Sequence, residues 1–298
     1  MNPPIALFVY NRPNHTKRTV ESLLSNPESK DHDLIIFSDA ARPKENPEKV
    51  SEVRSYLSKI SGFRSVTIHL QKENLGLSKS IISGVTYVLS KSERIIVMED
   101  DLLTSRYFLS YMKESLERFA DDNRVISIHG YVYPVKETLP NAFFLRGADC
   151  WGWATWRRGW NLFNPDGQQL LDELNRRELI KSFDFNGACK FSKMLRNQIK
   201  GQNDSWAVRW HASAFLANKL TLHPGRSLVH NIGNDNSGEH CDSNTTYDAK
   251  VSETPINLEG IEVAHSLLGQ LAFESFYRES QGSNFRKIAR LIKNILIK

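Results

Sequence analysis

Cysteine is scarce in this sequence of 298 residues: Cys150, Cys189 and Cys241 lie far apart, and no Cys-x-x-Cys pair occurs. The three cysteines support neither a disulfide framework nor a zinc ribbon, so a reducing compartment is expected. Long apolar runs are also missing, and the short run at residues 5–10 has no basic segment before it. That run is far below the roughly 18 residues that span a bilayer, so the sequence predicts neither a signal peptide nor a membrane anchor. We expect a cytoplasmic protein.

A strong excess of one charge is absent as well, because 39 Lys and Arg residues face 34 Asp and Glu residues and the net charge is +5. The basic residues are scattered through the chain. Nucleotides, phosphates and anionic lipid headgroups fit such a surface as well as nucleic acid does, and we expect no nucleic-acid partner. Apolar residues make up 40% of the chain, which is ordinary for a globular protein with a full core.

Four short apolar runs occur in the first hundred residues, at 5–10, 33–39, 65–70 and 94–98. Segments with apolar residues at helical spacing separate them. This alternation predicts an α/β fold with a Rossmann-like, mixed but mainly parallel sheet flanked by helices. Ligands bind to such sheets at the carboxyl ends of the strands.

Polar side chains follow each of these runs, where the strands should end: Asn11 and Arg12, Asp39, Asn74, and the consecutive acids Glu99, Asp100 and Asp101. Because the carboxyl ends of parallel strands share one edge of the sheet, we expect these side chains to converge on one crevice. Adjacent acids repel one another, which a protein tolerates where a cation or an acid-base task compensates. Taken singly, each amide could instead be a turn residue, and the acids a solvated cap of the helix expected at 105–119.

A further acid, Asp204, begins a segment that reads as a helix, with Trp206 and Trp210 close behind it. The helix dipole would keep its carboxylate ionised, as a base requires, and the two indoles could form a platform for a sugar. The alternative is a helix cap over two core tryptophans.

Four more tryptophans fall within residues 151–160. Trp153 follows Gly152, whose small size lets a ligand approach, so we predict that Trp153 binds a sugar. Trp156 and Trp160 have the spacing of a buried helical stripe and are expected in the core.

Together, the strand-end residues, the acid triplet, the Asp-x-Trp motif at 204–206 and the tryptophan-rich segment at 143–160 resemble metal-dependent glycosyltransferases of the GT-A fold, which use nucleotide-sugar donors. The layout is similar to that of the N-acetylglucosaminyltransferase that opens complex N-glycan synthesis, and of bacterial enzymes that build surface polysaccharides. The resemblance runs from about residue 5 to about residue 240.

The resemblance implies roles for individual residues. The metal, Mn²⁺ or Mg²⁺, would be held by Asp101 and His230, and the catalytic base would be Asp204. Trp206 would contact the acceptor. The donor would be bound by Asn11, Arg12, Asp39, Asn74, Lys79, Glu99, Asp100 and Trp153. His230 lies in a segment rich in His, Gly and Asn at 222–248, where an incidental surface histidine is the alternative.

The expected function is inverting transfer of a hexosyl or N-acetylhexosaminyl group from a nucleotide-sugar, with UDP preferred, to a saccharide or lipid-linked saccharide in surface polysaccharide synthesis. Two alternatives stay open. A sugar-1-phosphate nucleotidyltransferase would share the sheet and the metal, but the first strand lacks a Gly-rich phosphate loop. A non-catalytic saccharide-binding module would explain the tryptophans and leave the acids without a task.

The chain is expected to form one GT-A domain at 1–250, with a donor half at 1–130 and an acceptor half at 131–250, and a helical extension at 251–298. The extension ends in a segment, 284–298, with one apolar and one basic face. Such a helix suits peripheral contact with the inner face of the cytoplasmic membrane, and packing against the domain is the alternative.

Overall fold

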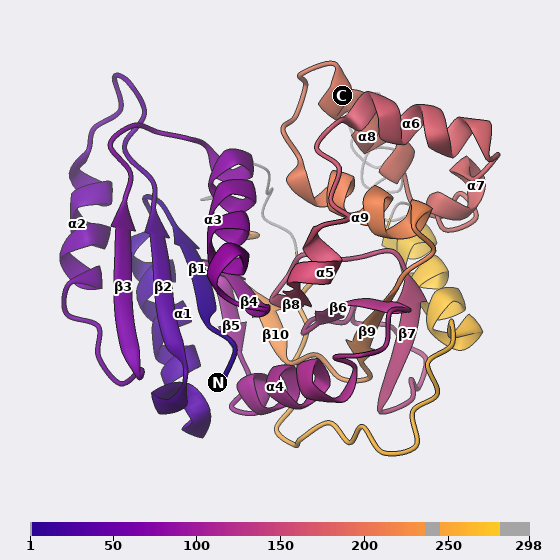
Figure 1. The fold of residues 1–298 in the computed structure, drawn as a ribbon, viewed down its shortest axis with the longest axis horizontal. Helices are drawn as coiled ribbons and strands as arrows, with labels where there is room; N and C mark the ends of the chain where they lie inside the picture. The colour runs from indigo at the N-terminus through magenta and orange to yellow at the C-terminus, as the bar shows by residue number, and fades with distance from the viewer. Residues whose placement is uncertain (1, 236–244, 281–298) are drawn as a thin grey trace, which may run out of the picture.

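The computed structural model describes residues 2–235 and 245–280. Its first half alternates strands and helices, as predicted (Figure 1). The elements are β1 (Ile5–Val9), α1 (Pro13–Leu24), a short 3₁₀ helix (Pro27–Asp31), β2 (Asp33–Ser38), α2 (Glu48–Leu57), β3 (Ser65–Leu70), α3 (Leu77–Lys91) and β4 (Arg94–Glu99). The four strands pair in parallel in the order β3-β2-β1-β4. Their carboxyl ends therefore lie at one edge of the sheet.

The second half extends this sheet with antiparallel and parallel strands. Its elements are β5 (Leu102–Thr104), α4 (Phe108–Arg118), β6 (Val125–His129), β7 (Ala142–Arg146), β8 (Trp153–Trp156), α5 (Arg157–Trp160), α6 (Gly167–Arg176), α7 (Ile180–Phe183), α8 (Phe191–Ile199), α9 (Trp206–Leu216), β9 (Leu220–Pro224) and β10 (Val229–Asn231). The full strand order is β3-β2-β1-β4-β8-β6-β9-β7, and β8 runs antiparallel to both of its neighbours. A separate two-stranded sheet pairs β10 with β5.

Alternate residues of β1 enter different cores, which explains why this strand is apolar throughout. Ile5 and Leu7 pack in the cluster that contains Val20 of α1, whereas Ala6 and Phe8 pack in the cluster that contains Ile81 of α3. All five residues of β1 are buried. A strand covered by helices on both faces needs apolar side chains on both faces, and the continuous runs in the sequence reflect this.

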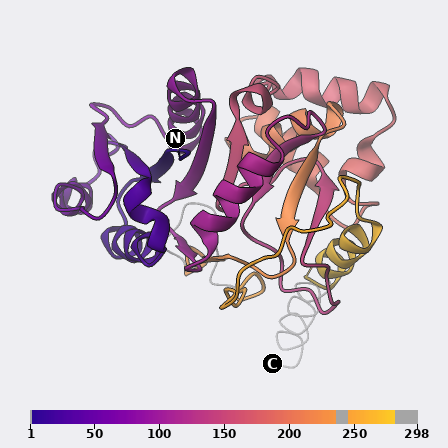
Figure 2. The ribbon, with the colours of Figure 1, turned by 60° about the horizontal axis from the view of Figure 1, so that its bottom comes forward.

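Helices α5 to α9 follow residue 131, and the last described segment packs on the outer side of this part of the molecule (Figures 1 and 2). Residues 267–280 form a helix, and its Phe273 and Tyr277 join a cluster with Phe143 of β7. The predicted amphipathic helix at 284–298 lies outside the described residues. Within the described part of the chain, no helix combines the length and the apolarity that a bilayer crossing requires.

Candidate functional site

The acids that follow β4 share the guanidinium of Arg12. Arg12 lies just before α1, and its Nη2 contacts a carboxylate oxygen of Asp100 and lies 2.9 Å from Oδ2 of Asp101. The backbone of the acidic segment is held in turn, because Thr19 of α1 donates a 2.8 Å hydrogen bond to the carbonyl of Asp100. The structure thus brings the ends of β1 and β4 together around two carboxylates and one fixed cation.

Burial and repulsion between neighbouring charges raise the pKa values of Glu99 and Asp100. The pKa of Glu99 is raised to about 8, first by burial and then by the charges of Asp101 and Asp100, with Arg12 acting in the opposite direction. Burial also raises the pKa of Asp100, and the charge of Arg12 offsets part of that effect. Burial alone would lower the pKa of Arg12, but the charges of Asp100 and Asp101 outweigh it and raise this pKa. The cluster therefore favours a positive charge beside it.

Asp39, at the end of β2, anchors the loop between β3 and α3. Its carboxylate accepts hydrogen bonds of 2.9 Å from the backbone N–H groups of Ala40, Leu75 and Gly76. Gly76 has φ of +74°, a left-handed conformation that suits glycine, and it caps α3. Asn74 adds a 2.7 Å hydrogen bond from its side-chain amide to the carbonyl of Ala40. Both predicted donor residues thus hold the same strand-end loop.

Two further predicted donor residues, Asn11 and Lys79, lie just after β1 and in the first turn of α3. The side-chain amide of Asn11 donates a 2.9 Å hydrogen bond to Glu45, which also accepts from the hydroxyl of Tyr10. Lys79 is exposed on the first turn of α3. These contacts tie the segment after β1 to the segment after β2.

On the far side of the acids, the chain after β10 passes very close to Asp101. A Cβ atom at Gly233 would lie 2.2 Å from Oδ2 of Asp101, so only glycine fits there without a shift. His230 in β10 pairs with Leu103 of β5, two residues beyond Asp101. Its Nδ1 is buried and has no hydrogen-bond partner within residues 2–235 and 245–280. His230 thus has a ring nitrogen free for a ligand.

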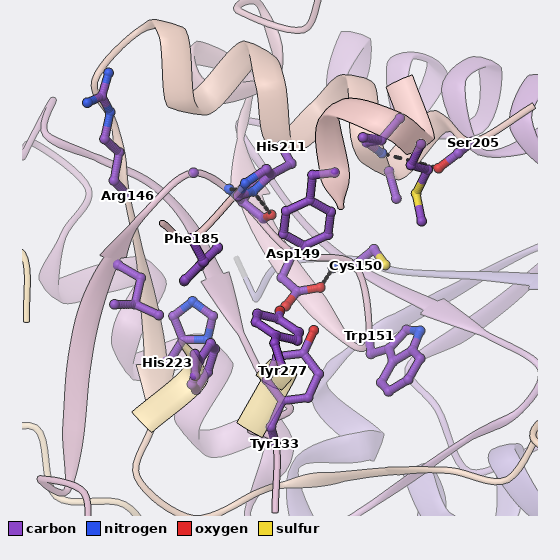
Figure 3. Close-up of a pocket in the computed structure, with 18 of the residues that line it drawn as sticks. Tyr133, Arg146, Asp149, Cys150, Trp151, Phe185, Ser205, His211, His223 and Tyr277 are labelled. Atoms are coloured by element: carbon purple, nitrogen blue, oxygen red, sulfur yellow. Dashed lines mark hydrogen bonds between the residues drawn. The ribbon is translucent and has the colours of Figure 1, made fainter. Parts of the chain in front are cut away.

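A cavity of about 400 Å³ opens beside the loop that leads into β8 (Figure 3). Its walls come from that loop, from α8, α9 and β9, and from the helix at 267–280. The lining includes Tyr133, Arg146, Asp149, Cys150, Trp151, Phe185, His211, His223 and Tyr277. Asn203 and Ser205, on either side of the predicted base, also line it. A cavity of this size and aromatic character is typical of a small-molecule site.

The sequence model of glycosyl transferase family 2 matches residues 5–175, more than half of the chain. The chain belongs to glycosyl transferase family 2. Its mixed, mainly parallel sheet flanked by helices agrees with the predicted GT-A fold.

This family 2 chain is similar to several solved structures, including one mannosyltransferase and TarS. The mannosyltransferase PcManGT of Pyrobaculum calidifontis, in complex with GDP-Man and Mn²⁺, is 14% identical, with a TM-score of 0.33 over 45% of this chain and 36% of that one. TarS of S. aureus is 11% identical, with a TM-score of 0.33 over 52% of this chain and 47% of that one. The chain spans less than half the length of either structure. Among curated proteins, none matches the chain.

Asp204, which follows the residues matched by the family 2 model, does not open α9 as predicted. Ser205 caps α9, accepting a 3.2 Å hydrogen bond from the backbone N–H of Val208, so Asp204 precedes the helix. The Asp204 side chain is 66% exposed and lies 3.1 Å from Nη2 of Arg209, which also donates to Ser78 of α3. The prediction that Asp204 opens the helix is thus wrong by one residue, because the serine hydroxyl satisfies the first turn instead.

Trp153 and Trp206, predicted to contact the donor and the acceptor, are core residues. Trp153 has 0% exposure, and its ring lies 5.6 Å from that of Trp206 and 5.7 Å from that of Trp210. Trp206 is buried in the same cluster. Neither indole has a face free to stack on a sugar, which corrects both predictions. Trp160 joins this core as expected.

Several residues of the site escaped the sequence-based prediction. Trp151 and Asp149 line the cavity, and the tryptophan-rich segment that contains them was the only signal for either. Arg54 of α2 donates hydrogen bonds to the carbonyls of Asp39 and Gln71, at 3.1 and 2.8 Å, and so joins the ends of β2 and β3. Nothing in the sequence pattern distinguishes Arg54 from other helix-surface arginines.

Proposed function

We propose that the protein is an inverting, divalent-metal-dependent glycosyltransferase that takes a nucleotide-sugar, with UDP preferred, and extends a saccharide. The observation that carries this proposal is the meeting of Arg12 with Asp100 and Asp101 at the strand ends of a family 2 domain. Nucleotide ligands bind at this edge of α/β sheets.

The residues present fit a hard divalent cation that completes its coordination with phosphate. Within the described ranges, no group of three or more His, Cys, Asp or Glu side chains is arranged to hold a metal by itself. Carboxylate oxygens are nevertheless the ligands that Mg²⁺ and Mn²⁺ prefer, and one or two suffice when a diphosphate supplies others. Asp101 is our choice for the direct ligand, with His230 close by in β10. When bound, the metal would neutralise the charge that develops on the departing diphosphate.

Residues of the chain itself would bind the phosphates, position the nucleoside and remove the acceptor proton. Arg12 offers a fixed positive charge to the phosphates, and Asp39 and Asn74 shape the loop against which a base and ribose would lie. Asp204 is our choice for the base that takes the proton of the acceptor hydroxyl, because it is next to two residues that line the cavity. Direct attack assisted by one base implies inversion at the anomeric carbon.

A screen of nucleotides by thermal stabilisation tests the proposal. UDP, GDP, CMP and dTDP would each be added to the full chain with and without Mn²⁺. We expect the largest rise in Tm with UDP plus Mn²⁺, since a ligand that binds only the native state stabilises it. A rise that is equal with and without the metal would contradict the metal-dependent part, and no rise with any nucleotide would contradict the function.

The acceptor side of the proposal includes a saccharide or lipid-linked saccharide of surface polysaccharide synthesis. Membrane contact through residues 284–298 belongs to this proposal and stays a prediction. Its measurement is sedimentation with anionic vesicles of the full chain and of a chain that ends at Ser283. Equal partition of the two would rule out membrane contact through this segment.

A further inference from the structure

The cavity in the acceptor half contains one carboxylate that lacks a cationic partner. The Asp149 side chain is 24% exposed, and its Oδ1 accepts a 2.8 Å hydrogen bond from the backbone N–H of Cys150. Nδ1 of His129 lies 3.8 Å from Oδ2 of Asp149. Burial raises the pKa of Asp149. Its donors are the backbone N–H and the side chain of Cys150, and neither carries a positive charge. A partly buried carboxylate without a cation is costly, so a ligand group that supplies a positive charge or a further hydrogen bond would be favoured.

The histidines around Asp149 do not supply that charge. Burial lowers the pKa values of His129 and His223 to about 3, so both are neutral at physiological pH. The tautomer of His129 follows from its contacts: the backbone N–H of Trp151 donates a 3.1 Å hydrogen bond to Nε2, which leaves the proton on Nδ1. That Nδ1 lies 3.4 Å from Nδ1 of His223. The same Nδ1 of His129 lies 3.8 Å from Oδ2 of Asp149, so a neutral imidazole faces this carboxylate and no positive charge does.

His211 adds a second acceptor atom to the cavity. Its Nδ1 lies 2.8 Å from the carbonyl oxygen of Ala148, a contact that requires the proton on Nδ1; the backbone N–H of Ala148 lies 3.2 Å from the same nitrogen. Nε2 is then an acceptor, and it is buried with no hydrogen-bond partner in the described part of the chain. His211 is 7% exposed and lines the cavity (Figure 3). Oδ2 of Asp149 and Nε2 of His211 can thus both accept a hydrogen bond from a ligand.

The cavity walls are aromatic and carry no available positive charge. Tyr133 and Tyr277 lie with ring centroids 5.2 Å apart, and Phe185 lies 5.5 Å from Tyr277. Among the described lining residues, Arg146 is the one Lys or Arg, and Figure 3 shows it directed away from the others. Its Nε donates a 2.9 Å hydrogen bond to the backbone carbonyl of Phe215. Its guanidinium carbon lies 4.0 Å from the centre of the Phe215 phenyl ring. Aromatic faces suit sugar rings and cations, whereas an anion would find no partner here.

The cavity also lies next to the acid cluster. Cys150 lines it, and the pKa of the Cys150 thiol is raised by burial and by the charges of Asp149, Glu99 and Asp101. The geometry agrees: Trp153, at the end of the loop that lines the cavity, pairs with Val97 of β4, two residues before Glu99. A Cβ atom at Gly152 would lie 3.5 Å from Sδ of Met98, the residue before Glu99. A molecule in the cavity would lie beside the donor crevice, where an acceptor must be.

We propose that this cavity is an acceptor subsite for a saccharide unit that is uncharged or carries an amino group, and that it rejects sugars with carboxylate or phosphate groups. Hydroxyl or ammonium groups donate to Asp149 and to Nε2 of His211, while a ring face lies on Trp151 or Tyr133. This assignment rests on the proposed glycosyltransferase function, whose acceptor class it names.

Ligand-detected NMR on the full chain tests the assignment with three disaccharides of similar size. Chitobiose is neutral, its fully de-N-acetylated form is cationic, and digalacturonic acid is anionic. We expect binding of the first two and at least a tenfold weaker affinity for the third. Each is measured with and without UDP and Mn²⁺, so that loss of nucleotide binding counts against the proposed function alone. Preference for digalacturonic acid, or binding of none in either condition, would overturn the subsite.

Matched variants locate the effect in the cavity. Asp149→Asn keeps the shape of the side chain and removes its charge, so it should weaken binding of the cationic disaccharide at least tenfold and narrow the discrimination against digalacturonic acid. His211→Phe should weaken both preferred disaccharides. Asp121→Asn, at an exposed acid outside the lining, should change none of these affinities. An unchanged preference in Asp149→Asn, with UDP binding intact as proof of folding, would exclude Asp149 as the selecting group.

Discussion

The acid cluster at residues 99–101, our proposed donor crevice, and the cavity beside β8, our proposed acceptor cavity, differ in how their charges are compensated. In the crevice, Asp100 and Asp101 share the guanidinium of Arg12, so negative charge is concentrated and partly neutralised by the protein itself. In the cavity, Asp149 stands alone among aromatic rings and neutral histidines. The first region suits a nucleotide diphosphate bound together with a divalent cation, which combine negative and positive charge. The second suits a ligand that brings hydrogen-bond donors and no negative charge.

The largest expected effect comes from Asp204, which lies between two residues that line the cavity. Asp204→Asn should lower kcat by about 10²- to 10⁴-fold, the usual contribution of a general base, and change the Kd for UDP less than about twofold. Steady-state transfer assays and calorimetry measure the two quantities. Asp121→Asn is the control and should keep both values. Turnover at the wild-type rate in Asp204→Asn would mean that another group takes the proton.

A core tryptophan and a cavity tryptophan should respond in different ways. Trp153→Ala should lower the free energy of unfolding by about 3–5 kcal/mol, because it empties a fully buried position. Trp153→Phe should cost less, since the indole N–H has no hydrogen-bond partner within the described residues and only volume is lost. Trp151→Ala, on the cavity wall, should mainly weaken disaccharide binding. Chemical denaturation and ligand-detected NMR separate these effects, and equal stability of Trp153→Ala and wild type would refute the core assignment.

The metal dependence of nucleotide binding should depend on Asp101. We expect Mn²⁺ to strengthen UDP binding by at least roughly tenfold in the wild type, which corresponds to about 1.4 kcal/mol, and the ratio to fall near one in Asp101→Ala. Calorimetric titrations of UDP with and without Mn²⁺ give this ratio directly. Asp33→Asn, at the opposite end of β2, should keep the full ratio. A preserved ratio in Asp101→Ala would assign the metal to other ligands.

The smallest effect is expected at the ion pair of Arg64 with Asp33, which lies outside both regions. It shows how little a solvent-exposed ion pair contributes to the free energy of unfolding. Hydrogen bonds from Arg64, and then from Ser65, lower the pKa of Asp33 to about 2. Because the folded-state pKa is below the unfolded value, this stabilisation is present above about pH 4 and is lost as the pH falls towards 2. Asp33→Asn should therefore cost less than about 1 kcal/mol at pH 7, and its cost should shrink at pH 3. Urea denaturation at both values measures the difference; a cost that grows on acidification would contradict the assigned pKa.

The sequence predicted the donor region far better than the acceptor region, for physical reasons. Buried parallel strands must be apolar on both faces, so β1, β2 and β4 appear as continuous runs, and the polar residues that end them mark a common edge. The acceptor cavity is built from segments far apart in the chain, such as Tyr133 and Tyr277. No spacing rule connects such residues. Only their packing in three dimensions shows that they share a wall.

The tryptophans show the same limit at the level of one residue. Their number at residues 151–160 indicated a site, but the point where β8 begins decides whether Trp151 and Trp153 share a face. Gly152, with φ of +64°, interrupts the extended backbone between them. Trp153 begins β8 and points into the core, whereas Trp151 lies two residues earlier in a loop and lines the cavity. Asp204 and Ser205 differ in the same way, since only the hydrogen bond to Val208 reveals which residue caps α9.

The register of β8 has a consequence for how acceptor choice could change during evolution. Val97 of β4 pairs with Trp153 of β8, so the residues before Trp153 continue alongside Glu99 and the acids that follow it. The segment 147–152 is therefore attached at one end to the β4–β8 strand pair, and the carboxylates that we propose as metal ligands follow β4 directly. Insertions or deletions in this short segment would reposition Asp149 and Trp151 while the ladder keeps the nucleotide half intact. New saccharide preferences could thus arise there without rebuilding the machinery that activates the donor.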